Sequence, residues 1–134
     1  MKRLLAKLCL PLAAALLACP AAASAGGSPR LAAAYMCEQI TDAGPENRAV
    51  VFSSSEGKIY CFCYFDTVPE KAVIYHDWYH GDRLATRRKL AAEPPSWKGY
   101  SSMQLRETDK GPWRVEIIGP DGRRLETVRF SVTE

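Results

Sequence analysis

The amino-acid sequence predicts an all-β domain, an immunoglobulin-like antiparallel β-sandwich of about seven strands. Short apolar and aromatic runs recur between clusters of turn-forming residues, which is typical of such sandwiches. No segment keeps a helical period over three turns. Trp78 lies in the middle of a strand-like run, where immunoglobulin domains carry a buried tryptophan. A small barrel has a similar pattern and stays open as an alternative.

The N-terminus has the pattern of a secretory signal peptide over residues 1–25. A basic start precedes an apolar run over residues 8–17, and Ala23-Ser24-Ala25 is typical of a cleavage site. We therefore expect export to the periplasm or the extracellular space. Residues 26–31, rich in Gly, Ser, Pro and Ala, are expected to be a flexible tether, and residues 32–134 a single domain.

Cys19 offers a second interpretation of this segment. It ends the run Leu16-Leu17-Ala18-Cys19, which is similar to a lipoprotein box in which the cysteine is acylated. Pro20 directly after it and the good cleavage site at Ala25 favour simple cleavage. Anchoring to a membrane is expected only if Cys19 is lipidated.

The charge of the exported part is balanced. The chain has 18 basic and 15 acidic residues, and residues 1–25 contain three of the basic and none of the acidic ones, which leaves 15 of each. The sequence therefore gives no electrostatic argument for nucleic-acid binding. Arg87-Arg88-Lys89 is a local basic cluster, which we interpret as a charged, solvated edge strand.

The expected strands are short runs bounded by Gly, Pro, Asn, Asp and Ser. In order, they are residues 32–39, 49–53, 58–65, 72–80, 83–90, 97–105, 113–118 and 125–132. Residues 41–48 are rich in turn formers and are expected to be a turn. The last two strands each place alternate apolar residues on one face, and Pro120-Asp121-Gly122 between them predicts a hairpin.

The strand over residues 72–80 contains both histidines of the chain. A strand rises about 3.3 Å per residue, so His76 and His80 lie about 13 Å apart and cannot share one metal ion. We expect no metal and no cofactor. His76 is expected at the edge of the core beside Trp78 with its nitrogens hydrogen-bonded, and His80 at the strand end.

Three cysteines remain after cleavage at Ala25, and an oxidising compartment allows them one disulfide. Cys61 and Cys63 are two apart on one strand, about 6–7 Å from each other, too far for a relaxed bridge. Cys37–Cys61 is the preferred pairing, which would leave Cys63 as a small buried side chain.

Catalytic motifs are weak. Ser101 or Ser102 beside His76 would offer a nucleophile and a base, but no nucleophile elbow, glycine-rich oxyanion loop or phosphate loop accompanies them. We therefore expect that the protein is not an enzyme.

Aromatic residues suggest a binding surface instead. If strands 58–65 and 72–80 are neighbours, five of their aromatic side chains share an outer face; if the chain crosses between sheets, the patch divides. The five are Tyr60, Phe62, Tyr64, Tyr75 and Tyr79. Trp97 and Tyr100 could form a stacking platform for sugar rings or for a partner's side chain, or Trp97 could cover the open end of the sandwich.

Several spaced motifs together resemble a known family. They are Cys37; Gly57-x-Ile59-Tyr60-Cys61-Phe62; Ile74-x-His76-x-Trp78-Tyr79-His80; Trp97-x-x-Tyr100-Ser101-Ser102; Gly111-x-Trp113-x-Val115-x-Ile117; Gly122-x-x-Leu125; and Phe130-x-Val132. Over residues 35–133 the chain resembles the bacterial domain of unknown function 2914. The resemblance implies a compact β domain of the bacterial envelope or of larger exported and membrane proteins, and it implies no activity. Cys63 stands outside these motifs.

We therefore expect a non-catalytic binding or interaction module of the bacterial cell envelope, with an envelope protein or a glycan as partner and no nucleic acid. One alternative is a carbohydrate or peptidoglycan-binding module that uses Trp97 and tyrosines. The other is a metal-dependent or hydrolytic enzyme centred on His76. The candidate binding residues are His76, Trp78, His80, Trp97, Tyr100, Ser101 and Ser102.

Overall fold

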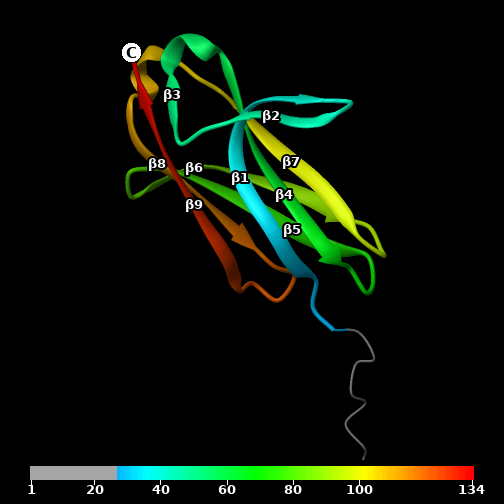
Figure 1. The fold of residues 1–134 in the computed structure, drawn as a ribbon. Helices are drawn as coiled ribbons and strands as arrows, with labels where there is room; N and C mark the ends of the chain where they lie inside the picture. Colours follow the sequence, from blue (N-terminus) through cyan, green and yellow to red (C-terminus); the bar gives the residue numbers. More distant parts are fainter. Residues whose placement is uncertain (1–26) are drawn as a thin grey trace, which may run out of the picture.

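The computed structural model describes residues 27–134, which form two β-sheets packed face to face (Figure 1). The strands are β1 (Arg30–Thr41), β2 (Gly44–Arg48), β3 (Val51–Ser53), β4 (Lys58–Thr67), β5 (Ala72–His80), β6 (Arg83–Ala92), β7 (Trp97–Gln104), β8 (Gly111–Ile118) and β9 (Arg124–Thr133). Two short 3₁₀ helices, η1 (Ser54–Glu56) and η2 (Glu107–Asp109), lie in the connections. Among these residues no helix has the length and apolar character to cross a membrane.

The strand order confirms the predicted sandwich. Sheet A has the order β2-β1-β4-β7, and sheet B has the order β3-β9-β8-β5-β6. Neighbouring strands are antiparallel except β3 and β9, which are parallel. In an immunoglobulin-type description, β1, β4 and β7 take the places of strands A, B and E, and β6, β5, β8 and β9 those of C′, C, F and G.

The core follows from the alternation of each strand. On β8 the inward set is Trp113, Val115 and Ile117, as expected, and all three are buried. Trp78 on β5 is 0% exposed and packs edge-to-face on Phe130 of β9, with ring centroids 5.9 Å apart. Burial of such side chains contributes about 1.5–3 kcal/mol each, so this alternation is the main reason that two sheets form.

Strand β2 was not expected. Residues 41–48 were predicted to be a turn, but β1 continues to Thr41 and pairs with β2, with Thr41 opposite Gly44. Gly44 has φ +110° and Asn47 has φ +56°, so two turn formers adopt positive φ within or beside regular pairing. Figure 1 shows this hairpin at the end of the sandwich opposite the entry of the chain.

The predicted disulfide is wrong. Cys37, Cys61 and Cys63 are all free and buried. In the register of β1 and β4, Cys61 lies opposite Met36, whereas Cys37 lies opposite Tyr60. Because successive side chains of a strand point to opposite faces, Cys37 points outward and Cys61 points into the core. The two sulfur atoms therefore lie on different sides of sheet A.

The N-terminal predictions fall on residues outside the described part. They concern the signal peptide over residues 1–25 and the lipidation of Cys19. Within the described part, β1 begins at Arg30, two residues before the expected start of the domain.

Candidate functional site

Three of the predicted site residues meet in the core between the two sheets. Ser101 lies on β7 of sheet A, and His76 and Trp78 lie on β5 of sheet B. The Trp78 Nε1–H donates to Ser101 Oγ over 3.0 Å, and Ser101 Oγ lies 2.7 Å from His76 Nδ1. Since the hydroxyl already accepts from Trp78, its own proton is available to His76 Nδ1. The contact joins the two sheets across the core.

Burial controls the ionisation of His76. It lowers the pKa of His76 to about 4, against a smaller upward effect of the neighbouring Asp77. The imidazole is therefore neutral at pH 7. Its Nε2 is buried and has no hydrogen-bond partner among the described residues. The expectation that both ring nitrogens are bonded is thus wrong for Nε2.

This arrangement has the components of a nucleophile and a base but lacks access. In an active pair the second nitrogen of the histidine normally bonds to an orienting group, and here Nε2 has none among residues 27–134. His76 is 0% exposed and Ser101 is 5% exposed. Neither lines any of the five surface hollows described for this chain. The cluster therefore serves the packing of the two sheets in this geometry.

His80 and Trp97 have structural surroundings as well. His80 ends β5, stacks on Trp113 at 4.3 Å between ring centroids, and has Nε2 2.9 Å from the Lys110 carbonyl oxygen. Trp97 packs on Phe65 and over Gly99, where an added Cβ would come within 2.0 Å of the indole. Trp97 thus covers the core at the start of β7, which agrees with the second of its two interpretations.

The predicted aromatic patch divides between the two sheets. The strand with Tyr60, Phe62 and Tyr64 is β4 of sheet A, whereas Tyr75 and Tyr79 lie on β5 of sheet B. The chain therefore crosses between sheets after residue 67, the second of the two arrangements considered. The two groups of aromatic side chains therefore lie on different sheets and contact different residues.

The outer face of sheet A gathers aromatic side chains from three strands in successive cross-strand rows. One row pairs Tyr35, Phe62 and Tyr100, and the rows on either side contribute Tyr60 and Tyr64. The ring centroids of Tyr35 and Phe62 are 5.2 Å apart, and those of Tyr60 and Tyr100 are 5.6 Å apart. Aromatic pairs at these distances stabilise the fold beyond the contribution of burying their surface. We call these five residues the aromatic face.

The β1–β2 hairpin makes the surface at the aromatic face concave. Residues 40–45 of the hairpin, together with Phe62, Lys98, Gly99 and Tyr100, line a hollow of about 320 Å³. A second hollow of about 300 Å³ shares Pro45, Phe62 and Lys98 with the first. Tyr100 is 49% exposed at this place, whereas Phe62 is 7% exposed. The two hollows form a groove with Phe62 as its floor.

Two basic side chains border the aromatic face. The Arg48 guanidinium lies 4.4 Å from the centre of the Tyr35 ring, and Lys98 Nζ lies 5.4 Å from that of Tyr64. Tyr100 and Ser102 of this surface were predicted as site residues from the sequence. Tyr35 was not predicted, because the pairing of β1 with β4 cannot be read from the residues of β1 alone.

The outer face of sheet B carries charged rows instead. By the register of its strands, these rows are Leu84–Tyr79–Arg114–Arg129, Arg87–Asp77–Glu116–Thr127 and Lys89–Tyr75–Ile118–Arg124. We call this surface the charged face. Its middle row sets two carboxylates, Asp77 and Glu116, directly opposite each other, which is unfavourable unless cations compensate.

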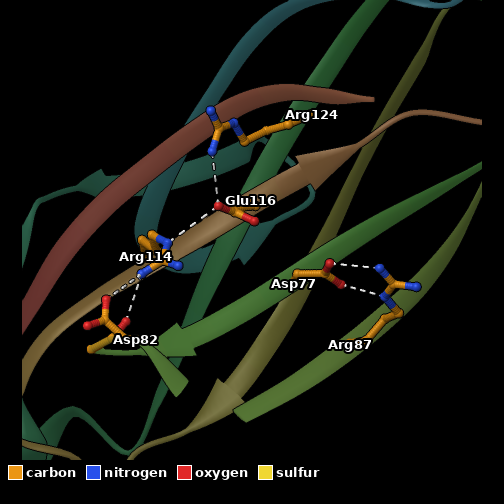
Figure 2. Close-up of polar contacts among 7 residues, drawn as sticks. Asp77, Asp82, Arg87, Arg114, Glu116 and Arg124 are labelled. Atoms are coloured by element: carbon orange, nitrogen blue, oxygen red, sulfur yellow. Dashed lines mark hydrogen bonds and ion pairs between the residues drawn. The ribbon is translucent and has the colours of Figure 1, made fainter. Parts of the chain in front are cut away.

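Arginines compensate both carboxylates, as Figure 2 shows. Arg87 binds Asp77 with two hydrogen bonds of 2.7 and 2.9 Å. Glu116 lies 3.5 Å from Arg114 and 3.3 Å from Arg124. The acids lie beneath the bases: the Asp77 and Glu116 side chains are 5% and 14% exposed, while those of Arg87 and Arg124 are 52% and 62% exposed.

The tyrosines of this face support two of the arginines. The Arg87 guanidinium lies 4.6 Å from the centre of the Tyr75 ring, and that of Arg114 lies 4.1 Å from the centre of the Tyr79 ring. Arg114 also donates to the Gly81 carbonyl oxygen over 2.8 Å. Tyr75 and Tyr79 are thus partly covered by cations, as Tyr35 and Tyr64 of the aromatic face are.

Comparison with protein-family models gives a match in the second half of the chain. Residues 71–132 match the family model described as "Protein of unknown function (DUF2914)". The match covers β5 to β8 and nearly all of β9, so it contains the whole charged face but only Lys98 to Ser102 of the aromatic surface. No curated protein matches the chain. The motifs before residue 71 lie outside the match, so the resemblance to the DUF2914 family is confirmed over residues 71–132.

Proposed function

We propose that this protein is a non-catalytic binding module of the bacterial cell envelope whose ligand lies across the aromatic face. The observation that carries the proposal is the groove over Phe62 with Tyr100 half exposed at its side. A solvent-exposed tyrosine beside a concave, partly apolar floor is the usual composition of a binding site. The signal-peptide pattern of residues 1–25 supports the envelope as the compartment.

A glycan chain that carries carboxylates, as peptidoglycan does, is the ligand that the chemistry of this groove favours. The apolar side of a sugar ring can lie on the Tyr100 ring, and the hollows have the volume of a small ligand site. Arg48 and Lys98 border the same surface, and each can donate to a carboxylate. Ser102 lies opposite Tyr60 in an adjoining row and offers a hydroxyl to the ligand.

The geometry favours this surface over the other candidate centres. Trp97 packs on Phe65 and Gly99, so a platform would use Tyr100 in place of Trp97. An enzyme centred on His76 would need a route to the Ser101 hydroxyl, which is 5% exposed. A protein partner on the aromatic face is the remaining competitor, and the experiment below separates it from a glycan.

The test is co-sedimentation of the exported chain with isolated peptidoglycan sacculi. We expect wild type to bind and Tyr100→Ala to bind at least about fivefold more weakly, because loss of one stacked ring costs about 1–3 kcal/mol, as for stacked bases. The matched control is Leu84→Ala, since Leu84 is 48% exposed on the charged face and Tyr100 is 49% exposed. Leu84→Ala should bind as wild type does.

Two outcomes would contradict the proposal. If wild type stays in the supernatant with the sacculi, peptidoglycan is not the ligand, and the aromatic face is left to a protein partner. If Tyr100→Ala and Leu84→Ala weaken binding equally, the ligand does not use the aromatic face.

A further inference from the structure

The charged face displays more positive than negative charge although the exported chain is balanced. Its three rows contain five basic side chains, Arg87, Lys89, Arg114, Arg124 and Arg129. They face the two carboxylates of the middle row and Asp82 of the adjoining turn, 3.7 Å from Arg114. Positive charge is therefore concentrated on one broad surface of a chain with 15 basic and 15 acidic residues after residue 25.

Two of the five bases have no carboxylate of their own. Lys89 and Arg129 are exposed and make no hydrogen bond or ion pair with another described residue. Arg129 lies directly opposite Arg114, a like-charge pair that sheets normally avoid. Both guanidiniums line a shallow hollow of about 270 Å³ beside the Gly81-Asp82 turn. An arrangement that costs stability while it concentrates donors points to an anionic ligand.

The remaining exposed groups of this sheet are apolar or amphipathic. Leu84 is 48% exposed in the row of Tyr79 and Arg114, and Val51 of β3 is 54% exposed opposite Ser131 of β9. Tyrosines, a few exposed aliphatic side chains and several arginines on one broad face are typical of surfaces that contact lipid headgroups. A small soluble anion would need donors that converge on one point, whereas these five donors are spread over the three strands β6, β8 and β9.

We propose that the charged face docks on a phospholipid surface that carries negative charge. Arg129, Lys89 and the outer nitrogens of Arg87, Arg114 and Arg124 bind headgroup phosphates, and Leu84 and Val51 lie at the headgroup boundary. This docking needs no lipid on Cys19. It is independent of the aromatic face, which belongs to the other sheet and stays open to a glycan.

The test is co-sedimentation of the chain from Gly26 onward, which contains both sheets, with lipid vesicles. Vesicles of phosphatidylcholine alone are compared with vesicles that contain phosphatidylglycerol. We expect binding only to the anionic vesicles and release at high salt. The variant Lys89→Ala/Arg129→Ala should bind at least about tenfold more weakly, since each basic residue near an anionic membrane contributes about 1 kcal/mol. It should fold, because neither side chain has an ion-pair partner among the described residues.

The control variant is Lys58→Ala/Lys71→Ala, which removes the same charge at exposed positions outside the three rows. Equal weakening of both double variants would show that net charge alone attracts the vesicle and would overturn the proposal. Absence of binding to the anionic vesicles, or binding to a soluble polyanion such as heparin with no binding to vesicles, would overturn it as well. Tyr100→Ala should bind vesicles as wild type does, which keeps this test separate from the sacculus experiment.

Discussion

The outer face of sheet A is aromatic at its centre, whereas the outer face of sheet B has two carboxylates at its centre. Both faces follow from the same two-residue alternation of strands packed on one core. On the aromatic face, rings contact rings and a hairpin stands over them. On the charged face, each acid is held beneath arginines. The core fixes which positions point outward, and the outward residues are then free to differ in chemistry and in ligand.

Both faces lie on one rigid sandwich, and His76 is buried in its core. The largest expected effect is the change in stability with pH that this burial causes. Burial lowers the pKa of His76 to about 4 from 6.5 in the unfolded chain. Between these values the unfolded chain binds more protons, so stability should fall by roughly 3 kcal/mol as pH falls from about 7 to about 4. The free energy of unfolding measured in urea across this range checks it.

A matched variant isolates this histidine. His76→Gln keeps a partner for Ser101 and removes the titration, so its stability should change much less with pH over the same range. The pKa values of Asp66 and Glu107 are lowered by their cationic partners. These two acids therefore make stability fall further at the acidic end of the pH range, and they do so in both proteins. An identical pH slope in wild type and His76→Gln would mean that His76 is accessible to protons in the folded state.

Two of the bidentate Arg–Asp pairs differ in how deeply the acid is buried, and their variants should have effects of intermediate size. Arg87–Asp77 belongs to the charged face with the acid side chain 5% exposed, and Arg30–Asp66 belongs to sheet A with its acid 31% exposed. We expect Asp77→Asn to lower the free energy of unfolding by about 1–3 kcal/mol. Asp66→Asn should lower it by less than Asp77→Asn does, because exposed ion pairs contribute little to stability.

Denaturant unfolding of both variants at neutral pH provides the measurement. If the two variants lose the same free energy of unfolding, burial of the acid does not make the Arg87–Asp77 pair stronger than the Arg30–Asp66 pair. If Asp77→Asn is stabilising, repulsion between Asp77 and Glu116 outweighs the bond to Arg87, and the charged face is strained in the absence of a ligand.

The smallest expected effect concerns Tyr100. Tyr100 is 49% exposed on an edge strand and contacts the Tyr60 ring, so Tyr100→Ala should lower the free energy of unfolding by only about 0.5–1.5 kcal/mol. Any loss of ligand binding in this variant would then be a property of the surface. A loss of several kcal/mol would instead place Tyr100 in the fold, and the binding result could not be assigned to the aromatic face.

Strands with regular alternation were predicted closely, because their inward residues are apolar and their ends carry turn formers. Residues 72–80 match β5, and the Pro120-Asp121-Gly122 turn joins β8 to β9 as expected. The charged run Arg87-Arg88-Lys89 lies on β6, which is an edge strand. Strand β2 was missed because its residues are polar turn formers, and only pairing with β1 makes them a strand.

The site was less predictable, since it depends on which strands become neighbours. The contact of Ser101 with His76 and Trp78 crosses from one sheet to the other and has no local signal. The expected Cys37–Cys61 bridge was wrong because a difference of one position in register reverses the side of the sheet. Tyr60, Phe62 and Tyr64 were recognised as a possible surface, but their partners Tyr35 and Lys98 come from other strands.

The most direct test of the central claim is to map the ligand surface by NMR. Soluble disaccharide-peptide fragments of peptidoglycan are titrated into isotope-labelled protein, and the backbone amide shifts are followed residue by residue. We expect saturable shifts on β4, β7 and the β1–β2 hairpin, centred on Phe62 and Tyr100, with sheet B unchanged. Shifts centred on the rows of Asp77 and Arg114, with none near Tyr100, would contradict it.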